Sequence, residues 1–505
     1  MAVKTNYELI HRLLEPDVFP HPCSEITLVE THISWVILTG PHAYKIKKPV
    51  NLGFADFSTL ERRHHFCEEE LRLNRRLAPD LYQEVVSITG TEANPKIAGK
   101  GNPFEYAVRM RQFDQNQLLS RLIQHDEVTA DHIDGLATTV AMFHDQIAIA
   151  DVASKFGSPE AVFDPVEANF DSILPALAGP EQELAEELQD WSQFQFDRLY
   201  DDFGLRKISG MIRECHGDMH LGNMFLNSAS DDHTRDVTIF DGIDFNSHLR
   251  WIDVMSEVAF TVMDLEDRGR PDLAHRFLNQ WLEETGDYGG LRILPFYMAY
   301  RAVVRAKVDA IRLAQGHLDH DERQHLNDDC AGYLKLAWKY TDSRRPVLMI
   351  TNGVSGSGKT TGTQDTVERM GAIRVRSDIE RKRLFGVKPS GLSTDTDIYT
   401  ADATEQTYDR LAELSKDIIQ AGYPVVIDAT FLKRDQRNRF CRLARCLGVP
   451  FFILQFAANE DVLRERVRQR QRLGVDASEA TTDVLDQQLQ SAEPIGPDEQ
   501  SVVMS

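Results

Sequence analysis

The pattern of apolar and polar positions near the N-terminus predicts a sheet with one early helix. Short apolar runs that alternate with polar residues occur at 26–29, 34–38 and 43–47, and a further run follows at 105–110. Alternation of this kind is typical of half-buried strands. Between them, a segment at about 59–77 is rich in Glu, Arg and Leu with helical spacing.

Later in the chain the pattern changes twice. Beyond residue 112 it is helical almost to residue 340, except for a strand-like stretch at 216–245. A polar break at 341–346 precedes a region where apolar runs alternate with helices, which favours a parallel sheet covered on both faces. The last dozen residues lack periodicity and are expected to form a loose tail. Strands in the C-terminal region are expected near 347–351, 372–376, 424–428 and 451–456.

The segment 353–360, G-V-S-G-S-G-K-T, fits the phosphate-binding pattern G-x-x-x-x-G-K-[ST] at every position. An apolar run precedes it and a plausible helix start follows, so backbone N–H groups and a helix N-terminus would converge on phosphate oxygens. The pattern predicts that Lys359 reaches the β- and γ-phosphates of ATP and that Thr360 binds Mg²⁺. The predicted nucleotide-binding residues are Gly353, Ser355, Gly356, Ser357, Gly358, Lys359, Thr360 and Thr361.

A second phosphate-transfer motif, H-G-D-M-H-L-G-N, lies upstream. Asp218 stands five residues before Asn223, which is the spacing between the base and the magnesium-binding amide of kinase catalytic loops. A metal-binding aspartate at the end of a following strand completes that set. Asp241 fits this position, and Asp244 is the alternative.

Composition indicates which surroundings the chain suits. The longest apolar runs are far shorter than the ~20 residues of a membrane-spanning helix, and the N-terminus has no apolar signal segment. The six cysteines are scattered without a C-x-x-C pair, which argues against a zinc site or a disulfide scaffold. We therefore expect a cytoplasmic protein with no membrane partner.

Charge is unevenly distributed along the chain. Residues 346–505 contain 21 Lys and Arg against 23 Asp and Glu, so the first 345 residues carry −21 of the net charge of −23. Such an acidic region binds nucleic acid poorly and suits a cationic substrate better. A nucleic-acid partner is therefore disfavoured, although it is not excluded.

The N-terminal part resembles the aminoglycoside phosphotransferase and choline-kinase-like branch of the protein-kinase-like fold, whose catalytic loop has the form H-G-D-x-H-x-x-N. The resemblance implies a two-lobed α+β domain, with a small lobe at about 1–112 and a helical lobe at about 113–345. It also implies that Asp218 is the base for an acceptor hydroxyl, and that Asn223 and Asp241 hold Mg²⁺ at the phosphates of ATP.

The same fold pairs a strand lysine with a helix glutamate. Lys45 and Lys47 lie on one face of a strand, so alternation does not separate them and both are candidates. Helix spacing favours Glu70 as the partner, with Glu69 as the alternative. Asp253 matches the family's structural aspartate, which is expected to hold the catalytic loop.

The C-terminal part resembles small P-loop kinases such as gluconate kinase, zeta-toxin-like kinases and the kinase part of polynucleotide kinases. These kinases place an aspartate against the acceptor hydroxyl, which implies Asp378 as a second base. Arg381 and Arg383 follow it and are candidates for binding an anionic acceptor. Asp428 ends an apolar strand, where it is expected to hold the water shell of Mg²⁺.

An arginine-rich helix resembles the lid of these kinases. Leu463 and Val467 mark its buried face, whereas Arg466 and Arg470 are one turn apart along one edge. The resemblance implies that both arginines stabilise charge on the transferring phosphoryl group.

Over nearly its whole length the chain resembles bacterial proteins in which the two kinase types are fused, with domains predicted at 1–345 and 346–505. The implied function is an ATP-dependent phosphotransferase with two nucleotide sites that acts on hydroxyl groups of small molecules. One alternative is a single catalytic domain with a nucleotide-sensing partner domain. Another is a polynucleotide-kinase-like enzyme that acts on nucleic-acid ends. The sequence predicts neither the acceptor nor the oligomeric state.

Overall fold

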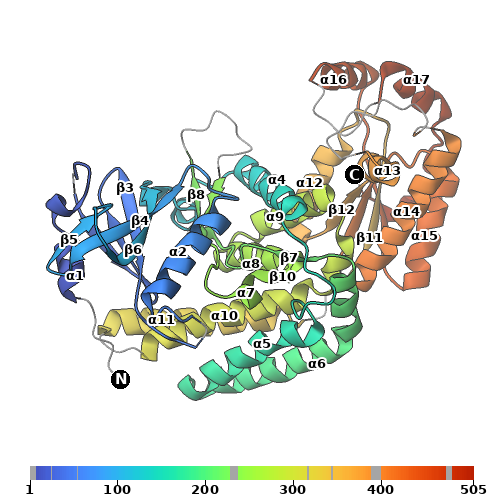
Figure 1. The fold of residues 1–505 in the computed structure, drawn as a ribbon. Helices are drawn as coiled ribbons and strands as arrows, with labels where there is room; N and C mark the ends of the chain where they lie inside the picture. The colour runs from blue at the N-terminus through green and yellow to red at the C-terminus, as the bar shows by residue number, and fades with distance from the viewer. Residues whose placement is uncertain are drawn as a thin grey trace. The chain divides into compact units, whose positions relative to one another are not determined.

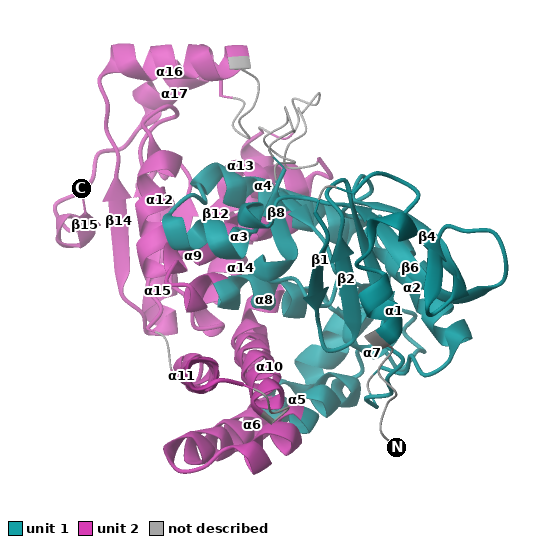
Figure 2. Ribbon diagram, turned by 90° about the vertical axis from the view of Figure 1, so that its left-hand side faces the viewer, with its two compact units in different colours: residues 1–168, 196–264 teal, residues 169–195, 265–505 magenta. Residues whose placement is uncertain are grey.

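The computed structural model of the chain describes residues 7–23, 25–53, 55–227, 237–314, 318–342, 345–387, 398, 400–473 and 480–504. The chain forms two compact units (Figure 2). Unit 1 consists of Met1–Ala168 and Phe196–Asp264, and unit 2 of Asn169–Gln195 and Leu265–Ser505. Helices α5 (Pro159–Ile173), α6 (Pro180–Ile208) and α8 (Val254–Asp267) each begin in one unit and end in the other.

Unit 1 begins with a six-stranded antiparallel sheet in the order β1-β2-β3-β6-β4-β5 (Figure 1). Apolar side chains pack on both faces of the sheet: Trp35 and Ile46 lie in one core, and Ala43 and Val108 lie in another with Cys67. The strands are β1 (Thr27–Glu30), β2 (Ser34–Leu38), β3 (His42–Lys47), β4 (Tyr82–Thr91), β5 (Asn94–Ile97) and β6 (Pro103–Arg111). β4 and β5 were not predicted.

The remainder of unit 1 is mainly helical, with two small antiparallel pairs at the predicted interruption. β7 (Ile212–Glu214) pairs with β10 (Trp251–Asp253), and β8 (Met224–Leu226) pairs with β9 (Val237–Ile239). The catalytic-loop motif lies between β7 and β8, so both ends of the loop are fixed by strands. The other helices that lie entirely in this unit are α1 (Tyr7–Arg12), α2 (Leu60–Asn74), α3 (Leu119–Leu122), α4 (Ala130–Gln146) and α7 (Ser247–Arg250).

Unit 2 is built around a five-stranded parallel sheet in the order β12-β13-β11-β14-β15. The strands are β11 (Leu348–Asn352), β12 (Ile373–Arg376), β13 (Val425–Asp428), β14 (Phe451–Gln455) and β15 (Val503–Met504). The helices that follow β11 are α12 (Lys359–Met370), α13 (Ser377–Leu384), α14 (Ala401–Gln420), α15 (Arg434–Leu447), α16 (Glu460–Leu473) and α17 (Thr482–Ser491). The predicted α/β fold is confirmed: the structure has an antiparallel sheet in unit 1 and the predicted parallel sheet in unit 2.

Three helices that precede the sheet also belong to unit 2: α9 (Pro271–Thr285), α10 (Leu294–Ala314) and α11 (His320–Lys339). They lie before residue 345, where the sequence predicts the end of the first domain. That domain boundary stays a prediction. The compact units divide the chain elsewhere because α9 packs against α12 and β12. Of the predicted break at 341–346, residues 343–344 lie outside the described part of the chain.

The expected loose C-terminal tail is wrong. β15 adds to the sheet beside β14, with Ile453 opposite Val503. Just before it, Glu499 makes an ion pair with the buried Arg437 at 2.7 Å. A strand of two residues is too short to produce a visible alternation, so the pattern did not reveal it. No helix in the described ranges has the length and apolar character to cross a membrane.

Candidate active sites

The loop after β7 presents Asp218 next to Asn223. The Asn223 side-chain amide donates to Asp218 Oδ2 at 2.9 Å and to the Asp218 carbonyl at 3.0 Å. The preceding Gly217 has φ of 88°, and a Cβ there would lie 2.7 Å from the Leu249 carbonyl oxygen. Glycine is therefore required at this turn. The side chain of Asp218 is 37% exposed, so it can meet a substrate.

Two carboxylates on helix α8 accept hydrogen bonds from the backbone of this loop. The fully buried Glu257 accepts a hydrogen bond from Gly217 N at 2.6 Å and pairs with His144 Nε2 at 2.9 Å. Burial alone would raise the pKa of Glu257, but the bond to His144 lowers it, so the carboxylate stays charged. Two turns further along α8, Asp264 accepts a hydrogen bond from Leu221 N of the loop at 2.7 Å. Neither carboxylate was predicted from the sequence.

Asp253, expected to hold the catalytic loop, has different partners. It makes two bonds to Arg206, at 2.5 and 2.7 Å, and accepts from Met255 N at the start of α8. Its support of the loop is therefore indirect, through the helix that carries Glu257.

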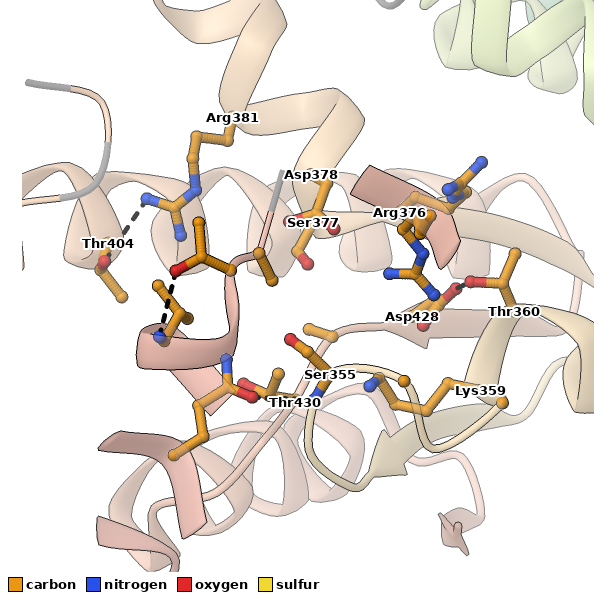
Figure 3. Close-up of a pocket in the computed structure, with 18 of the residues that line it drawn as sticks. Ser355, Lys359, Thr360, Arg376, Ser377, Asp378, Arg381, Thr404, Asp428 and Thr430 are labelled. Carbon is orange, nitrogen blue, oxygen red and sulfur yellow. Dashed lines mark hydrogen bonds between the residues drawn. The ribbon is translucent and has the colours of Figure 1, made fainter. Parts of the chain in front are cut away.

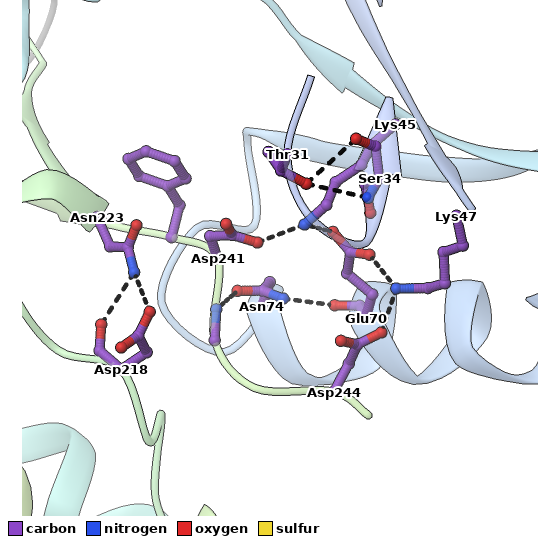
Figure 4. A network of polar contacts seen from close by, with 12 residues as sticks. Thr31, Ser34, Lys45, Lys47, Glu70, Asn74, Asp218, Asn223, Asp241 and Asp244 are labelled. Atoms are coloured by element: carbon purple, nitrogen blue, oxygen red, sulfur yellow. Dashed lines mark hydrogen bonds and ion pairs between the residues drawn. The ribbon is translucent and has the colours of Figure 1, made fainter. Parts of the chain in front are cut away.

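A network of five charged side chains connects β3, α2 and the segment after β9 (Figure 4). Glu70 of α2 bonds Lys45 at 2.9 Å and Lys47 at 2.8 Å, so both strand lysines reach the same carboxylate. Lys45 also pairs with Asp241, and Lys47 pairs with Asp244. The alternative partner, Glu69, instead pairs with Arg72 at 2.9 Å.

The two lysines differ in exposure. Lys47 and Asp244 are buried, with side chains 1% and 5% exposed, whereas Lys45 is 12% and Asp241 44% exposed. Burial would lower the pKa of Lys45, but Asp241 and Glu70 raise it well above its ordinary value. Lys45 is thus a permanently charged group next to an accessible carboxylate.

The backbone around Asp241 is fixed by two polar side chains that the sequence did not reveal. Asp241 N donates to the Tyr82 hydroxyl at 3.1 Å, and Gly242 N donates to Asn74 Oδ1 at 2.7 Å. Asp241 has φ of 63°, a left-handed conformation that aspartate tolerates better than most residues. The contacts keep its carboxylate between Asn223 and Lys45 (Figure 4).

The second site is a pocket of about 820 Å³ in unit 2, formed at the carboxyl ends of the parallel strands (Figure 3). This edge is where ligands bind in open α/β sheets. The lining residues are Ser355, Gly356, Gly358, Lys359, Thr360, Thr361, Arg376, Ser377, Asp378, Arg381, Thr404, Tyr408, Asp428, Ala429, Thr430, Gln436, Arg470, Ala480, Thr481, Val484, Gln487 and Gln488.

The phosphate loop joins β11 to α12, as its motif requires. Lys359 Nζ donates to the carbonyl oxygens of Gly353 and Val354 at 3.0 and 2.9 Å, and burial lowers the pKa of this lysine. Thr360 donates to Asp428 Oδ2 at 2.6 Å, so the two predicted magnesium ligands are adjacent. Ser355 N donates to Gln488 of α17 at 2.8 Å.

Two predicted loop residues, Gly353 and Ser357, are not among the lining residues. Gly353 lies against the chain after β14, where a Cβ would come within 2.5 Å of the Phe456 carbonyl oxygen. Its role is close packing of the loop rather than direct contact with the pocket.

Asp378 and Arg381 line the pocket opposite the phosphate loop (Figure 3). Arg381 donates to the Ile398 carbonyl at 2.8 Å, whereas Arg383 points elsewhere and bonds the Glu283 carbonyl at 2.7 Å. Arg376 also lines the pocket and was not predicted, because β12 carries arginine at both 374 and 376 and alternation does not indicate which of them meets a pocket.

The two predicted lid arginines lie at the phosphate loop in different ways. Arg470 lines the pocket, and Arg466 donates to the Gly356 carbonyl at 3.2 Å. Leu463 and Val467 are buried and pack with Leu485 of α17, as the spacing along α16 predicted.

Comparison with known proteins matches the C-terminal part of the chain to a family model. Residues 348–495 match a family model described as an AAA domain. Uncharacterized proteins of Mycobacterium tuberculosis and Mycobacterium bovis are each 27% identical over 473 residues, which cover 91% of this chain and 89% of each relative.

Solved structures similar to the chain include kinases of both predicted types. An amicoumacin kinase is 12% identical and covers 64% of this chain and 89% of its own, with a TM-score of 0.40. A choline/ethanolamine kinase family protein from Mesorhizobium loti is 9% identical over 63% and 92%, with a TM-score of 0.37. A gluconokinase from Sinorhizobium meliloti is 23% identical over 32% and 82%, with a TM-score of 0.22.

Proposed function

We propose that the chain is an ATP-dependent phosphotransferase with two nucleotide sites, each of which transfers the γ-phosphoryl group to a hydroxyl group of a small molecule. One observation carries this proposal: each unit combines an accessible carboxylate, a lysine and a pair of oxygen ligands. Asp218, Lys45 and the Asn223–Asp241 pair form the set in unit 1. The second set includes Asp378 and the phosphate loop.

The donor sets fit Mg²⁺ in both sites. Mg²⁺ prefers oxygen ligands from one or two side chains together with phosphates and water. In unit 1 these are the Asn223 amide oxygen and the Asp241 carboxylate; in unit 2 they are the Thr360 hydroxyl and Asp428, which lie 2.6 Å apart. When bound, the metal would neutralise charge on the phosphates of ATP.

In unit 1, Asp218 would accept the proton of the acceptor hydroxyl while the oxygen of that hydroxyl forms a bond to the γ-phosphorus. The bond from the γ-phosphorus to the bridging oxygen breaks, and ADP leaves. Lys45, held by Glu70 at 2.9 Å, supplies a fixed positive charge for the phosphates. Lys47 is buried between Glu70 and Asp244 and serves to hold β3 on α2.

In unit 2, Asp378 would take the same role as base, opposite Lys359. The cations Arg376 and Arg381 in the pocket wall favour an acceptor that carries negative charge. The neutral side chains around them, among them Thr404 and Gln436, can hydrogen-bond further hydroxyl groups. We therefore expect an anionic, hydroxyl-bearing acceptor in unit 2. The cytoplasmic location stays a prediction from the sequence.

We expect the intact chain to bind two molecules of ATP in the presence of Mg²⁺. Lys359→Ala should weaken ATP binding at the site in unit 2 more than tenfold, or by about 1.4 kcal/mol. The substitution removes the charge that faces the β- and γ-phosphates. Calorimetric titration measures both affinities and the number of sites. Lys416→Ala removes an exposed lysine on α14, outside the pocket lining, and serves as the control. Two unchanged sites in Lys359→Ala would contradict the proposal.

The acceptors are identified with radiolabelled ATP and a panel of sugars, sugar acids, aminoglycosides, nucleosides and oligonucleotides with 5′-hydroxyl ends. Labelled product that depends on Lys359 assigns the acceptor to unit 2, and product that depends on Asp218 assigns it to unit 1. Labelling of oligonucleotides alone would instead support an enzyme of nucleic-acid ends.

Asp241→Asn and Asp244→Asn are expected to have different effects. Asp241 is accessible beside Asn223, so its substitution should weaken Mg²⁺-dependent ATP binding in unit 1 by at least tenfold with little loss of stability. Asp244→Asn removes a partner of the buried Lys47 and should cost about 3 kcal/mol of stability, the low end for a broken buried pair, since Glu70 remains. Thermal unfolding and ATP titration with and without Mg²⁺ separate the two. The reverse assignment follows if only Asp244→Asn impairs metal-dependent binding.

A further inference from the structure

Helix α9 packs against the nucleotide site of unit 2, although it precedes the predicted domain boundary at 345. Its apolar face is buried through Phe277, Leu278 and Trp281. Near the start of α9, His275 and Arg276 bond the backbone and the side chain of Glu368, both at 2.8 Å. Glu368 lies on α12, the helix that begins with the phosphate-loop lysine.

Further along α9, Asn279 pairs with the free edge of the parallel sheet. Its amide donates to the Ala372 carbonyl at 3.0 Å and accepts from Arg374 N at 2.7 Å. β12 is the terminal strand of the sheet order, and these two groups are on the side opposite β13. The side chain thus takes the place of a neighbouring strand, which protects an edge that would otherwise be open.

One turn later, Glu283 connects α9 to the phosphate loop. Its carboxylate bonds Arg374 Nε at 2.9 Å, and both side chains are buried. The same guanidinium donates to the Thr360 carbonyl at 3.2 Å and to Gln364 at 2.8 Å. Thr360 is the predicted magnesium ligand, so the Glu283–Arg374 pair supports the backbone that carries it.

Glu283 also faces the pocket wall. Its second oxygen lies 3.6 Å from Arg376, which lines the pocket two residues before Asp378. Figure 3 shows Arg376 directed into the pocket near Asp428. Without the negative charge of Glu283 behind it, the guanidinium of Arg376 would be drawn further towards Asp378 and Asp428, because opposite charges attract strongly where water is scarce.

We propose that Glu283 is a positioning residue for phosphoryl transfer in unit 2, which acts by holding Arg374 beneath the phosphate loop and Arg376 at the pocket wall. Helix α9 is therefore a structural part of the C-terminal nucleotide site. This inference depends on the proposed function of that site. Helix α9 belongs to the region that the sequence predicts as the first kinase domain. The proposal gives this helix a role in the site of the second domain.

The test measures ATP hydrolysis, with water as the acceptor, in the full chain with Asp218→Asn to silence unit 1. We expect Glu283→Gln to lower kcat at least tenfold while the KM for ATP changes less than threefold. Arg376→Gln is expected to lower kcat similarly, and the double variant should lose no more than the stronger single variant. Losses that multiply in the double variant would show that Glu283 does not act through Arg376 and would overturn the proposal.

Glu284→Gln is the matched control. This neighbouring carboxylate on α9 bonds Gln280 within the same helix, and its substitution should leave kcat within twofold. Glu283→Asp keeps the charge and should restore at least a third of the wild-type kcat, which a purely structural loss would not allow. If Glu283→Gln does not fold, Arg376→Gln alone decides, since a normal kcat in that variant overturns the proposal.

The proposed function of unit 2 and the role of Glu283 can be disproved separately. If Lys359→Ala has no effect on nucleotide binding, the proposed function of unit 2 is wrong. If Lys359→Ala abolishes turnover but Glu283→Gln hydrolyses ATP at the wild-type rate, only the role of Glu283 is wrong.

Discussion

Asp218→Asn should lower phosphoryl transfer in unit 1 by about 10²–10⁴-fold while leaving ATP affinity nearly unchanged, which is the range that general-base catalysis contributes. Asparagine keeps the shape of the side chain and can still accept the 2.9 Å hydrogen bond from Asn223. It cannot take a proton from the acceptor hydroxyl. The loss should therefore appear in kcat and in kcat/KM alike, as for an interaction made in the transition state.

The measurement uses the Lys359→Ala chain, so that transfer to an acceptor from the panel reports unit 1. ATP affinity is followed by calorimetry in the same samples. Asp145→Asn replaces an exposed aspartate on α4 in the same unit and should have no effect on either quantity. A turnover within tenfold of the parent chain, or a loss of ATP affinity as large as that of Asp241→Asn, would exclude Asp218 as the base.

The phosphate-handling motifs could be predicted because their chemistry is local. The phosphate loop needs one strand, one turn and one helix, all contiguous in sequence, and the structure has β11, the loop and α12 in that order. Similarly, the five-residue spacing between Asp218 and Asn223 is closed by a hydrogen bond of 2.9 Å within a single loop. Short-range geometry of this kind is determined by residue type and spacing.

The choice between Lys45 and Lys47 could not be predicted, because strand alternation places both on one face. It depends on which aspartate each lysine meets nearly 200 positions later in the chain, and on how deeply each pair is buried. The supports of the loops were missed for the same reason. Glu257 lies on a helix 40 residues after the glycine that it holds.

In unit 2, the packing of a whole helix on the sheet could not be predicted from the sequence. The polar break at 341–346 predicts a linker, but it carries no information about which helices pack on the sheet. Asn279 and Glu283 have the ordinary appearance of polar residues on an amphipathic helix, whereas in the structure both are buried against β12. Only the three-dimensional arrangement shows that α9 completes the edge of the parallel sheet.

Replacing Arg466 and Arg470 together by glutamine should lower turnover in unit 2 by at least about 10²-fold, the cost of removing a preorganised donor to a transition state, with less than tenfold change in ATP affinity. Arg470 lines the pocket near Lys359, and its positive charge contributes to the lowered pKa of that lysine after burial itself. Arg466 reaches the loop at the Gly356 carbonyl. In the proposed transfer, both charges would therefore lie where negative charge shifts as the phosphoryl group moves.

The matched control is Arg468→Gln with Arg472→Gln, since these arginines lie on the same helix with the same spacing but neither lines the pocket. The two double variants change net charge equally, so a general electrostatic effect on ATP would lower both activities alike. We expect a large loss of kcat only for the Arg466 and Arg470 pair, measured by ATP turnover in the Asp218→Asn background. Equal losses in the two pairs, or a loss confined to ATP affinity, would show that α16 contributes charge to nucleotide binding and not to the transfer step.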